Sequence, residues 1–330
     1  MFSVELGSFF LSYVLKMLVK DQILALCLSI SLSFAFPICN SESSITLLYQ
    51  NNLNGTDDVN HLSFLLLDPT PLKDASSACG TLNEKLLSKS AIQAHSADVL
   101  QSLAYVAYAG RAAPVQFYYI DNGLVSFSSF TNTLSYPTFS FWGLPLPVLC
   151  TQSSTSNQPG NSVATTANEI TVASNGNNFI GFRNQKSFRF LGIPFANPVK
   201  RFTYSSPNSA KGQTFTATAY GPECPQYGSG AEDCLFLNIQ TPYIPNDKDK
   251  KDLRPVLFWI YGGGFTGGSG ADPLTDGGNL ASREDIVVVT INYRLSTLGF
   301  LAIPGTSIKG NFGLADQITA LEVFFTPLPP

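Results

Sequence analysis

The second half of the sequence predicts an α/β fold with a mostly parallel sheet, and three neighbouring features carry this prediction. Val256–Tyr261 (VLFWIY) and Ile286–Asn292 (IVVVTIN) are apolar runs of strand length, typical of strands covered on both faces. A glycine-rich loop lies between them. After them, Leu314, Ile318 and Leu321 fall at i, i+4 and i+7, which predicts an apolar stripe on a helix.

The composition narrows the class of protein. The chain has 330 residues, enough for two domains, and 44% of them are hydrophobic. Only 13% are charged, about half the usual share. The net charge of −4 and the absence of a basic stripe exclude nucleic acid as a partner. No cysteine has the spacing or the histidine partner of a metal ligand, so we expect no metal and no cofactor.

Residues 1–35 are predicted to be a cleaved signal peptide. Ile23–Phe36 is uncharged but too short to span a bilayer comfortably. Ser33 and Ala35 place small residues at the −3 and −1 positions of a cleavage site. Met17 offers an alternative start with a shorter leader. We therefore expect a secreted protein, and the alternative interpretation of this segment is an uncleaved membrane anchor.

The cysteines agree with secretion. In an oxidising compartment, those after the signal are interpreted as disulfides with one left over. Asn54-Gly55-Thr56 is the one N-glycosylation sequon. The cysteines concerned are Cys39, Cys79, Cys150, Cys224 and Cys234.

Residues 36–150 are predicted to form a separate small N-terminal domain of unknown fold and function. We expect strands at 45–49 and 62–67, a helix at 91–113, and a hairpin at 117–129 around Asn122-Gly123. His61 and His95, the chain's two histidines, fall here and are interpreted as structural.

A polar segment, residues 151–168, follows and is predicted to be a linker because it offers little apolar surface. Beyond it, strands at 170–173 and 179–182 flank Asn175-Gly176, a second hairpin signal. A third strand is expected at 188–193.

Gly262, Gly263 and Gly264 directly follow the first apolar run. Glycines at a strand end leave backbone N–H groups unshielded and free to adopt unusual φ angles. A pocket for a developing oxyanion needs such donors. The alternative interpretation is a tight turn without a ligand.

Five ordered motifs resemble the type-B carboxylesterase, cholinesterase and lipase family, and they span residues 169–322. The most specific is Glu232–Ile239 (EDCLFLNI), which is similar to the family's second signature. The others are Phe190–Ala196 (FLGIPFA), Trp259–Phe265 (WIYGGGF), Asn292–Leu295 (NYRL) and Gly310–Gln317 (GNFGLADQ).

The resemblance implies an α/β-hydrolase fold and hydrolysis of carboxylic esters through an acyl-serine. It places the oxyanion donors at the N–H groups of Gly263 and Gly264, and it pairs Cys234 with Cys224. Cys79 with Cys150 is the second pairing considered, leaving Cys39 free. Asp316 and Gln317 are expected to hold helix and sheet together.

The sequence departs from the family after Glu322. There the family continues to a strand and the nucleophile elbow GxSxG. This chain has a Pro-rich tail at 323–330 and contains no GxSxG, and Gly267–Ala271 lacks the last glycine, which argues against Ser269. No histidine follows His95 to act as general base.

We therefore predict a hydrolase fold truncated before its nucleophile elbow. None of the catalytic residues is present, since the nucleophilic serine, the acid and the histidine would lie beyond the C-terminus. The family acts on ester substrates, but the chain as given is expected to be inactive. The alternative is a non-catalytic secreted binding or adhesion protein of the same fold family. The oligomeric state is not indicated.

Overall fold

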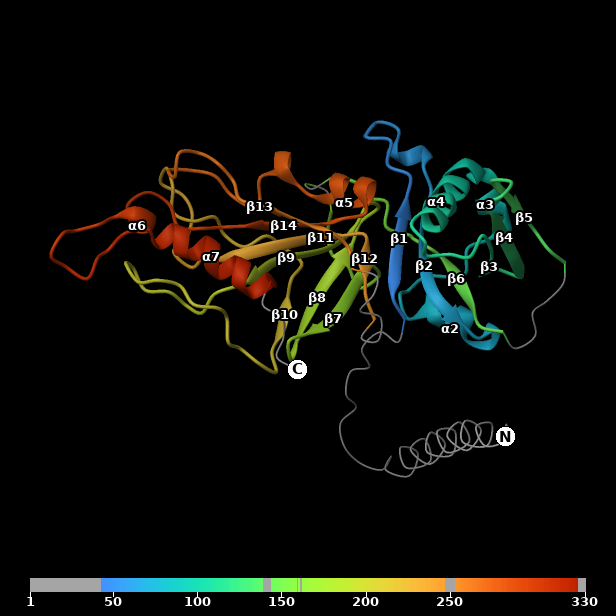
Figure 1. The fold of residues 1–330 in the computed structure, drawn as a ribbon, viewed down its shortest axis with the longest axis horizontal. Coiled ribbons are helices and arrows are strands. Elements are labelled where there is room, and N and C mark those ends of the chain that lie inside the picture. The colour runs from blue at the N-terminus through green and yellow to red at the C-terminus, as the bar shows by residue number, and fades with distance from the viewer. Residues whose placement is uncertain (1–42, 139–143, 159, 161, 247–252, 326–330) are drawn as a thin grey trace, which may run out of the picture. The chain divides into compact units, whose positions relative to one another are not determined.

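A computed structural model describes residues 43–138, 144–158, 160, 162–246 and 253–325 (Figure 1). The described residues form one compact unit. The predicted signal peptide, Cys39 and the last five residues of the Pro-rich tail lie outside the described residues. The predicted division at residues 151–168 stays a prediction.

A seven-stranded sheet contains every strand described before residue 152, together with β12, in the order β12-β1-β2-β6-β3-β4-β5. Its pairs are antiparallel except for β3 and β6. The strands expected at 45–49 and 62–67 and the hairpin at 117–129 are confirmed. The bounds are β1 Ile45–Tyr49, β2 Ser63–Thr70, β3 Val115–Ile120, β4 Gly123–Ser128, β5 Thr133–Ser135, β6 Leu146–Thr151 and β12 Tyr243–Ile244.

The helix expected at 91–113 is in fact two helices, α3 Lys89–Ala94 and α4 Ser96–Tyr108, which follow α2 Leu72–Gly80. The break falls at His95, whose backbone (φ −120°, ψ 42°) is not helical. The second helix ends before Gly110, which adopts a φ of 75° that disfavours other residues. The apolar side chains Ile92, Val99, Leu103 and Val106 of these helices are buried.

A second sheet has the order β10-β8-β9-β11-β14-β13, with β7 paired to β8. The expectation of a mostly parallel sheet was wrong, because only β13–β14 and β10–β8 are parallel. Short turns join β7, β8 and β9, and such turns connect antiparallel strands only. The bounds are β7 Glu169–Ser174, β8 Asn177–Arg183, β9 Phe188–Pro194, β10 Thr214–Thr216, β11 Phe236–Thr241, β13 Val256–Trp259 and β14 Val287–Ile291.

The two apolar runs differ in burial. β14 lies inside the sheet and is almost wholly buried, as predicted. β13 lies at the edge, and its Leu257 and Trp259 remain 38% and 41% exposed. The expectation that both strands are covered on both faces therefore holds for β14 alone.

Three helices follow β13: α5 Gly278–Glu284, α6 Ser296–Phe300 and α7 Phe312–Phe325. The last continues past Glu322 into the Pro-rich tail, because the first proline after its start comes at position 327. Its predicted apolar stripe was also wrong, since Leu314 and Ile318 are exposed. The face that is buried carries Asp316 and Ala320, because Asp316 pairs with an arginine at the end of β14.

Two disulfides are present, Cys79–Cys150 and Cys224–Cys234, and both pairs are those considered from the sequence. The first joins α2 to β6 and the second closes a short loop before β11. The chain also crosses between the sheets, because β12 follows β11 after one residue and pairs with β1.

The turn between β8 and β9, which we call the buried polar turn (Arg183–Ser187), joins distant parts of the unit. Arg183 is fully buried and donates to the Glu84 carboxylate at 2.6 Å and to the Leu82 carbonyl at 2.8 Å. Lys186 lies 2.8 Å from the buried carboxylate of Asp58. Buried charges are stable only when paired in this way.

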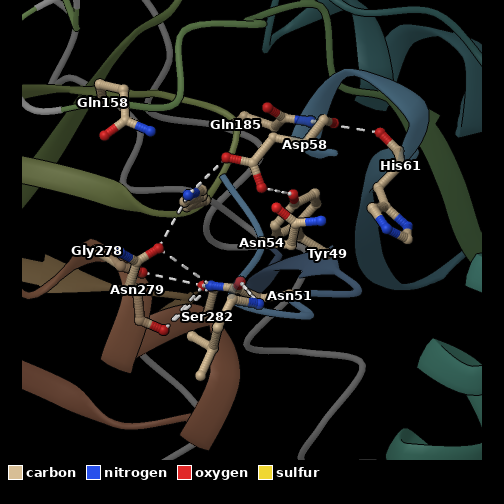
Figure 2. A network of polar contacts seen from close by, with 12 residues as sticks. Tyr49, Asn51, Asn54, Asp58, His61, Gln158, Gln185, Gly278, Asn279 and Ser282 are labelled. Atoms are coloured by element: carbon tan, nitrogen blue, oxygen red, sulfur yellow. Dashed lines mark hydrogen bonds and ion pairs between the residues drawn. The ribbon is translucent and has the colours of Figure 1, made fainter. Parts of the chain in front are cut away.

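The same turn holds the segment that precedes β2. Figure 2 shows Asp58 between Tyr49, which donates to its carboxylate at 2.5 Å, and Gln185, which donates to its carbonyl at 2.7 Å. Lys186 also donates to Asn279 of α5 at 2.9 Å. The buried polar turn therefore contacts the segment before β2 and α5, and it is linked to β1 through Asp58.

Candidate functional site

The candidate site lies where β13 and β14 end. Parallel strands have their carboxyl ends at the same edge of a sheet, where α/β proteins bind ligands. The segment Gly262–Gly270, which we call the glycine loop, follows β13, and Asn292–Arg294 follows β14. The site is therefore built from the two loops that the sequence singled out.

The glycine loop takes a backbone path that few residues can follow. Gly263, Gly264 and Phe265 have φ angles of 118°, 60° and 63°. A Cβ on Gly263 would lie 2.1 Å from the Gly267 carbonyl oxygen, so only glycine fits there. An added Cβ on Gly264 would meet open space, although its φ still disfavours other residues.

Gly263 and Gly264 are both exposed residues. Within the described part of the chain, neither of their amide N–H groups donates a hydrogen bond. Unpaired backbone donors at an accessible site can bind an anion or a developing negative charge. This is what the oxyanion prediction requires of the two residues.

Two tyrosines fix the entrance to the glycine loop. The rings of Tyr261 and Tyr293 stack with centroids 4.5 Å apart. Each hydroxyl donates to the other residue's carbonyl oxygen at 3.0 Å. Burial raises the pKa of the Tyr261 hydroxyl, so it stays protonated and keeps donating. The ends of β13 and β14 are thereby locked together.

The far end of the loop is held by side chains of the sheet. The Gly270 N–H donates to the Asn292 side chain at 2.9 Å. The Gly270 carbonyl accepts from Thr290 at 2.7 Å and from Asn238 at 3.2 Å. A Cβ on Gly270 would lie 2.7 Å from the Ile291 carbonyl oxygen, so this close approach requires glycine.

An ion pair joins α7 to the end of β14. The Arg294 guanidinium donates twice to the Asp316 carboxylate, at 2.8 Å each, and both side chains are buried. Two such parallel bonds fix geometry as well as charge. Asp316 thus contacts sheet and helix, while Gln317 beside it is half-buried.

The other sequence candidates lie elsewhere or have other partners. The Ser269 hydroxyl accepts from the Ala271 N–H at 3.1 Å within the glycine loop. His61 and His95 both contact Asp98 of α4, at 2.8 and 3.8 Å. Asn54 is exposed, as a glycan acceptor must be. Its side chain accepts a hydrogen bond from Thr56, the third residue of its sequon.

Sequence reasoning gave no role to Asn238 and Gln226, which contact the glycine loop directly. Their signal was present, because Asn238 lies inside the motif EDCLFLNI and Gln226 two residues after Cys224. Among the residues that the structure describes, no group of acidic, histidine or cysteine side chains could hold a metal ion. In the same residues, no helix has the length and apolarity to cross a membrane.

The sheet and helices of the second half fit part of an α/β-hydrolase fold. A family model described as "Carboxylesterase family" matches residues 171–324, so this region is similar to that family. Residues 36–150 lie outside the segment that the family model matches.

Individual relatives agree with the family model. Acetylcholinesterase-1 of Trittame loki is 40% identical over 150 residues, which cover 41% of this chain and 27% of that protein. Para-nitrobenzyl esterase of Bacillus subtilis is 38% identical over 150 residues, 41% of this chain and 30% of that protein. The chain thus spans less than a third of the length of these relatives.

Among solved structures, the carboxylesterase EST55 of Geobacillus stearothermophilus is 40% identical, with a TM-score of 0.42. That similarity covers 46% of this chain and 33% of that one.

Proposed function

We propose that residues 169–322 form the oxyanion-binding part of a carboxylic ester hydrolase. The observation that carries the proposal is that Gly263 and Gly264, beyond the carboxyl end of β13, are exposed and that their N–H groups donate no hydrogen bond among the described residues. When an ester carbonyl is attacked, negative charge develops on its oxygen. Two fixed backbone donors stabilise that charge more than they stabilise the neutral ester, which is how binding lowers a barrier.

The contribution expected of such donors is large. Removing one oxyanion donor typically costs about 3–4 kcal/mol in the transition state. The loop suits this task because the tyrosine pair and Asn292 hold it before a substrate arrives, so little reorganisation is needed. The nucleophile and the general base must come from other residues, since the sequence has no GxSxG and no histidine after His95.

A chimera tests the proposal. Residues 171–324 would replace the matching segment of the Bacillus subtilis para-nitrobenzyl esterase, to which they are similar. We expect the chimera to hydrolyse p-nitrophenyl butyrate. The purified 330-residue chain should give no turnover above an empty-vector preparation. A folded but inactive chimera, or turnover by the 330-residue chain, would contradict the proposal.

A matched pair of variants isolates the two N–H groups. In the chimera, Gly264→Ala should lower kcat by about 10- to 100-fold, because it shifts a donor from its position. Gly212→Ala is the control. Both glycines have positive φ, 60° and 69°, and neither has an atom within 4 Å of an added Cβ. Equal losses in both variants would mean that backbone strain, rather than the site, determines activity.

We also propose that the protein is secreted and glycosylated at Asn54. The two disulfides support this, because such bonds persist in oxidising compartments. The exposed Asn54 is accessible to a transferase. Secreted protein treated with a peptide:N-glycosidase should lose the mass of one glycan. An unchanged mass would contradict the assignment.

A further inference from the structure

The loop closed by Cys224–Cys234 lies directly against the glycine loop. Both cysteines are fully buried, and the chain between them folds back on itself where Gln226 and Ser229 exchange backbone hydrogen bonds at 3.1 and 2.8 Å. The ring of Tyr227 in this loop leaves no room at Gly267, where an added Cβ would lie 2.5 Å away. The two loops are in van der Waals contact.

One side chain of the disulfide loop binds the backbone of the glycine loop at two points. The Gln226 amide nitrogen donates to the Gly268 carbonyl at 2.8 Å. Its amide oxygen accepts from the Gly268 N–H at 2.7 Å. Gly268 has a φ of 124° and lies against the Tyr261 ring, so this approach requires glycine. The contact satisfies both backbone groups of one residue with one side chain.

We propose that Gln226 is a positioning residue that fixes the glycine loop, and that the Cys224–Cys234 disulfide acts on the site through it. This inference rests on the proposed oxyanion role for its functional meaning. The geometry supports it because Gly268 lies four residues after Gly264, and Thr266 between them closes the turn by donating to the Gly263 carbonyl at 3.1 Å. Fixing Gly268 therefore restricts the turn that carries the two donors.

A primary amide is well suited to this position. It is the side-chain group that offers a donor and an acceptor side by side, at the spacing of a backbone N–H and C=O. Glutamate would keep the acceptor, but when ionised it would place a negative oxygen against the Gly268 carbonyl. Once protonated it could donate again. The Gln226→Glu variant should therefore hold the loop in a pH-dependent way that the natural residue does not.

The test is amide hydrogen exchange in the full 330-residue protein, read at Thr266 and Gly270. Both amides donate to groups other than Gln226, so faster exchange there reports the loop and not the loss of one bond. In Gln226→Ala we expect exchange at these amides to rise about tenfold or more. Gln213→Ala, which removes an exposed glutamine, is the control and should leave them unchanged.

Two further arms exclude a merely structural effect. In Gln226→Glu, protection relative to an unstructured peptide should return as the pH falls through the carboxyl's range, about 4 to 5. The Cys224→Ala/Cys234→Ala variant should raise exchange at Thr266 and Gly270, and adding Gln226→Ala should increase it little further. Exchange in β14 should stay constant throughout, which reports that the sheet remains folded.

Unchanged exchange at Thr266 and Gly270 in Gln226→Ala would overturn the proposal, as would full additivity of the disulfide and Gln226 variants. The measurement needs no turnover. An inactive chimera would therefore contradict the oxyanion role but not the positioning role of Gln226. Unchanged exchange would contradict the positioning role but not the oxyanion role.

Discussion

Two regions of this molecule hold their backbone in place by opposite means. The glycine loop is fixed mainly by uncharged groups, and its glycines let other backbone atoms approach closely, as at Gly263 and Gly270. The buried polar turn is fixed by charged side chains, Arg183 with Glu84 and Lys186 with Asp58, which are almost completely withdrawn from solvent.

The difference has a physical consequence for the site. A positively charged residue in the glycine loop would attract water and counter-ions before any substrate binds. Backbone N–H groups carry only partial charge, and they can remain exposed without a partner. In the polar turn the reverse holds. There, ion pairs between buried side chains join segments far apart in the sequence, and no polar group has to stay free to bind a ligand.

The largest expected effect follows from breaking a pair in the polar turn. Glu84→Ala leaves the Arg183 guanidinium buried without its counter-charge, and we expect the free energy of unfolding to fall by about 3–5 kcal/mol. Urea denaturation monitored by circular dichroism measures it. Glu232→Ala is the control, because Glu232 pairs with Arg201 at the surface and should give no measurable change.

A double replacement separates the charge from the packing. Arg183→Met together with Glu84→Leu removes both charges and keeps most of the volume, so stability should return close to that of the natural protein. If the double variant were as unstable as Glu84→Ala, the packing of this turn, and not its charge pairing, would distinguish it from the glycine loop.

Removing a disulfide should give the next largest loss of stability, and one disulfide lies beside each of the two regions. Cys150 adjoins Thr151, which donates to Glu84 near the polar turn, and Cys224 precedes Gln226 at the glycine loop. Their sequence separations are 71 and 10. Loop-closure entropy then predicts that removing Cys79–Cys150 costs about 4 kcal/mol and removing Cys224–Cys234 about 3 kcal/mol.

The comparison uses Cys79→Ala/Cys150→Ala and Cys224→Ala/Cys234→Ala in the same urea titration. A larger loss from the shorter loop would show that Cys224–Cys234 stabilises the folded site directly, beyond its effect on the unfolded chain. That outcome would strengthen the link between this disulfide and the glycine loop.

The two regions also differ in how far the sequence predicted them. The glycine loop was found because its residues are contiguous and follow a strand, and the motifs around it carry the family resemblance. The buried polar turn was not predicted, because Arg183 and Glu84 lie 99 positions apart and no local sequence pattern indicates that they form a pair. Charged residues normally lie at the surface, so their burial here became visible only in three dimensions.

The errors in the fold have similar causes. The apolar run at β13 was expected to be covered on both faces, yet sheet order, which the sequence does not reveal, places it at an edge. The stripe of Leu314 and Ile318 was expected to face the core. The Arg294–Asp316 pair instead turns the opposite face of α7 inward. In both cases a long-range contact overrode a local pattern.

The smallest expected effect is a pH dependence confined to the polar-turn region. His61, whose carbonyl accepts from Gln185, contacts Asp98 at 2.8 Å and Asp57 at 3.2 Å. Its hydrogen bond to Asp98 is the chief reason that its pKa is raised. A raised pKa in the folded state means that the protonated ring stabilises the fold. That contribution is complete below the unfolded value of about 6.5 and is lost as pH rises through the folded value.

Stability should therefore decline slightly between about pH 6 and pH 8, and His61→Gln should flatten that decline. Gln213→Ala, which removes an exposed uncharged side chain, is the control and should leave the slope in place. Urea titrations across this range measure the slope. Over the same range the Thr266 and Gly270 amides, corrected for intrinsic exchange, should keep constant protection, because the glycine loop is held by groups that do not titrate there. If protection of these amides fell together with the stability as pH rises, the buried polar turn and the glycine loop would be energetically coupled, although different contacts hold them.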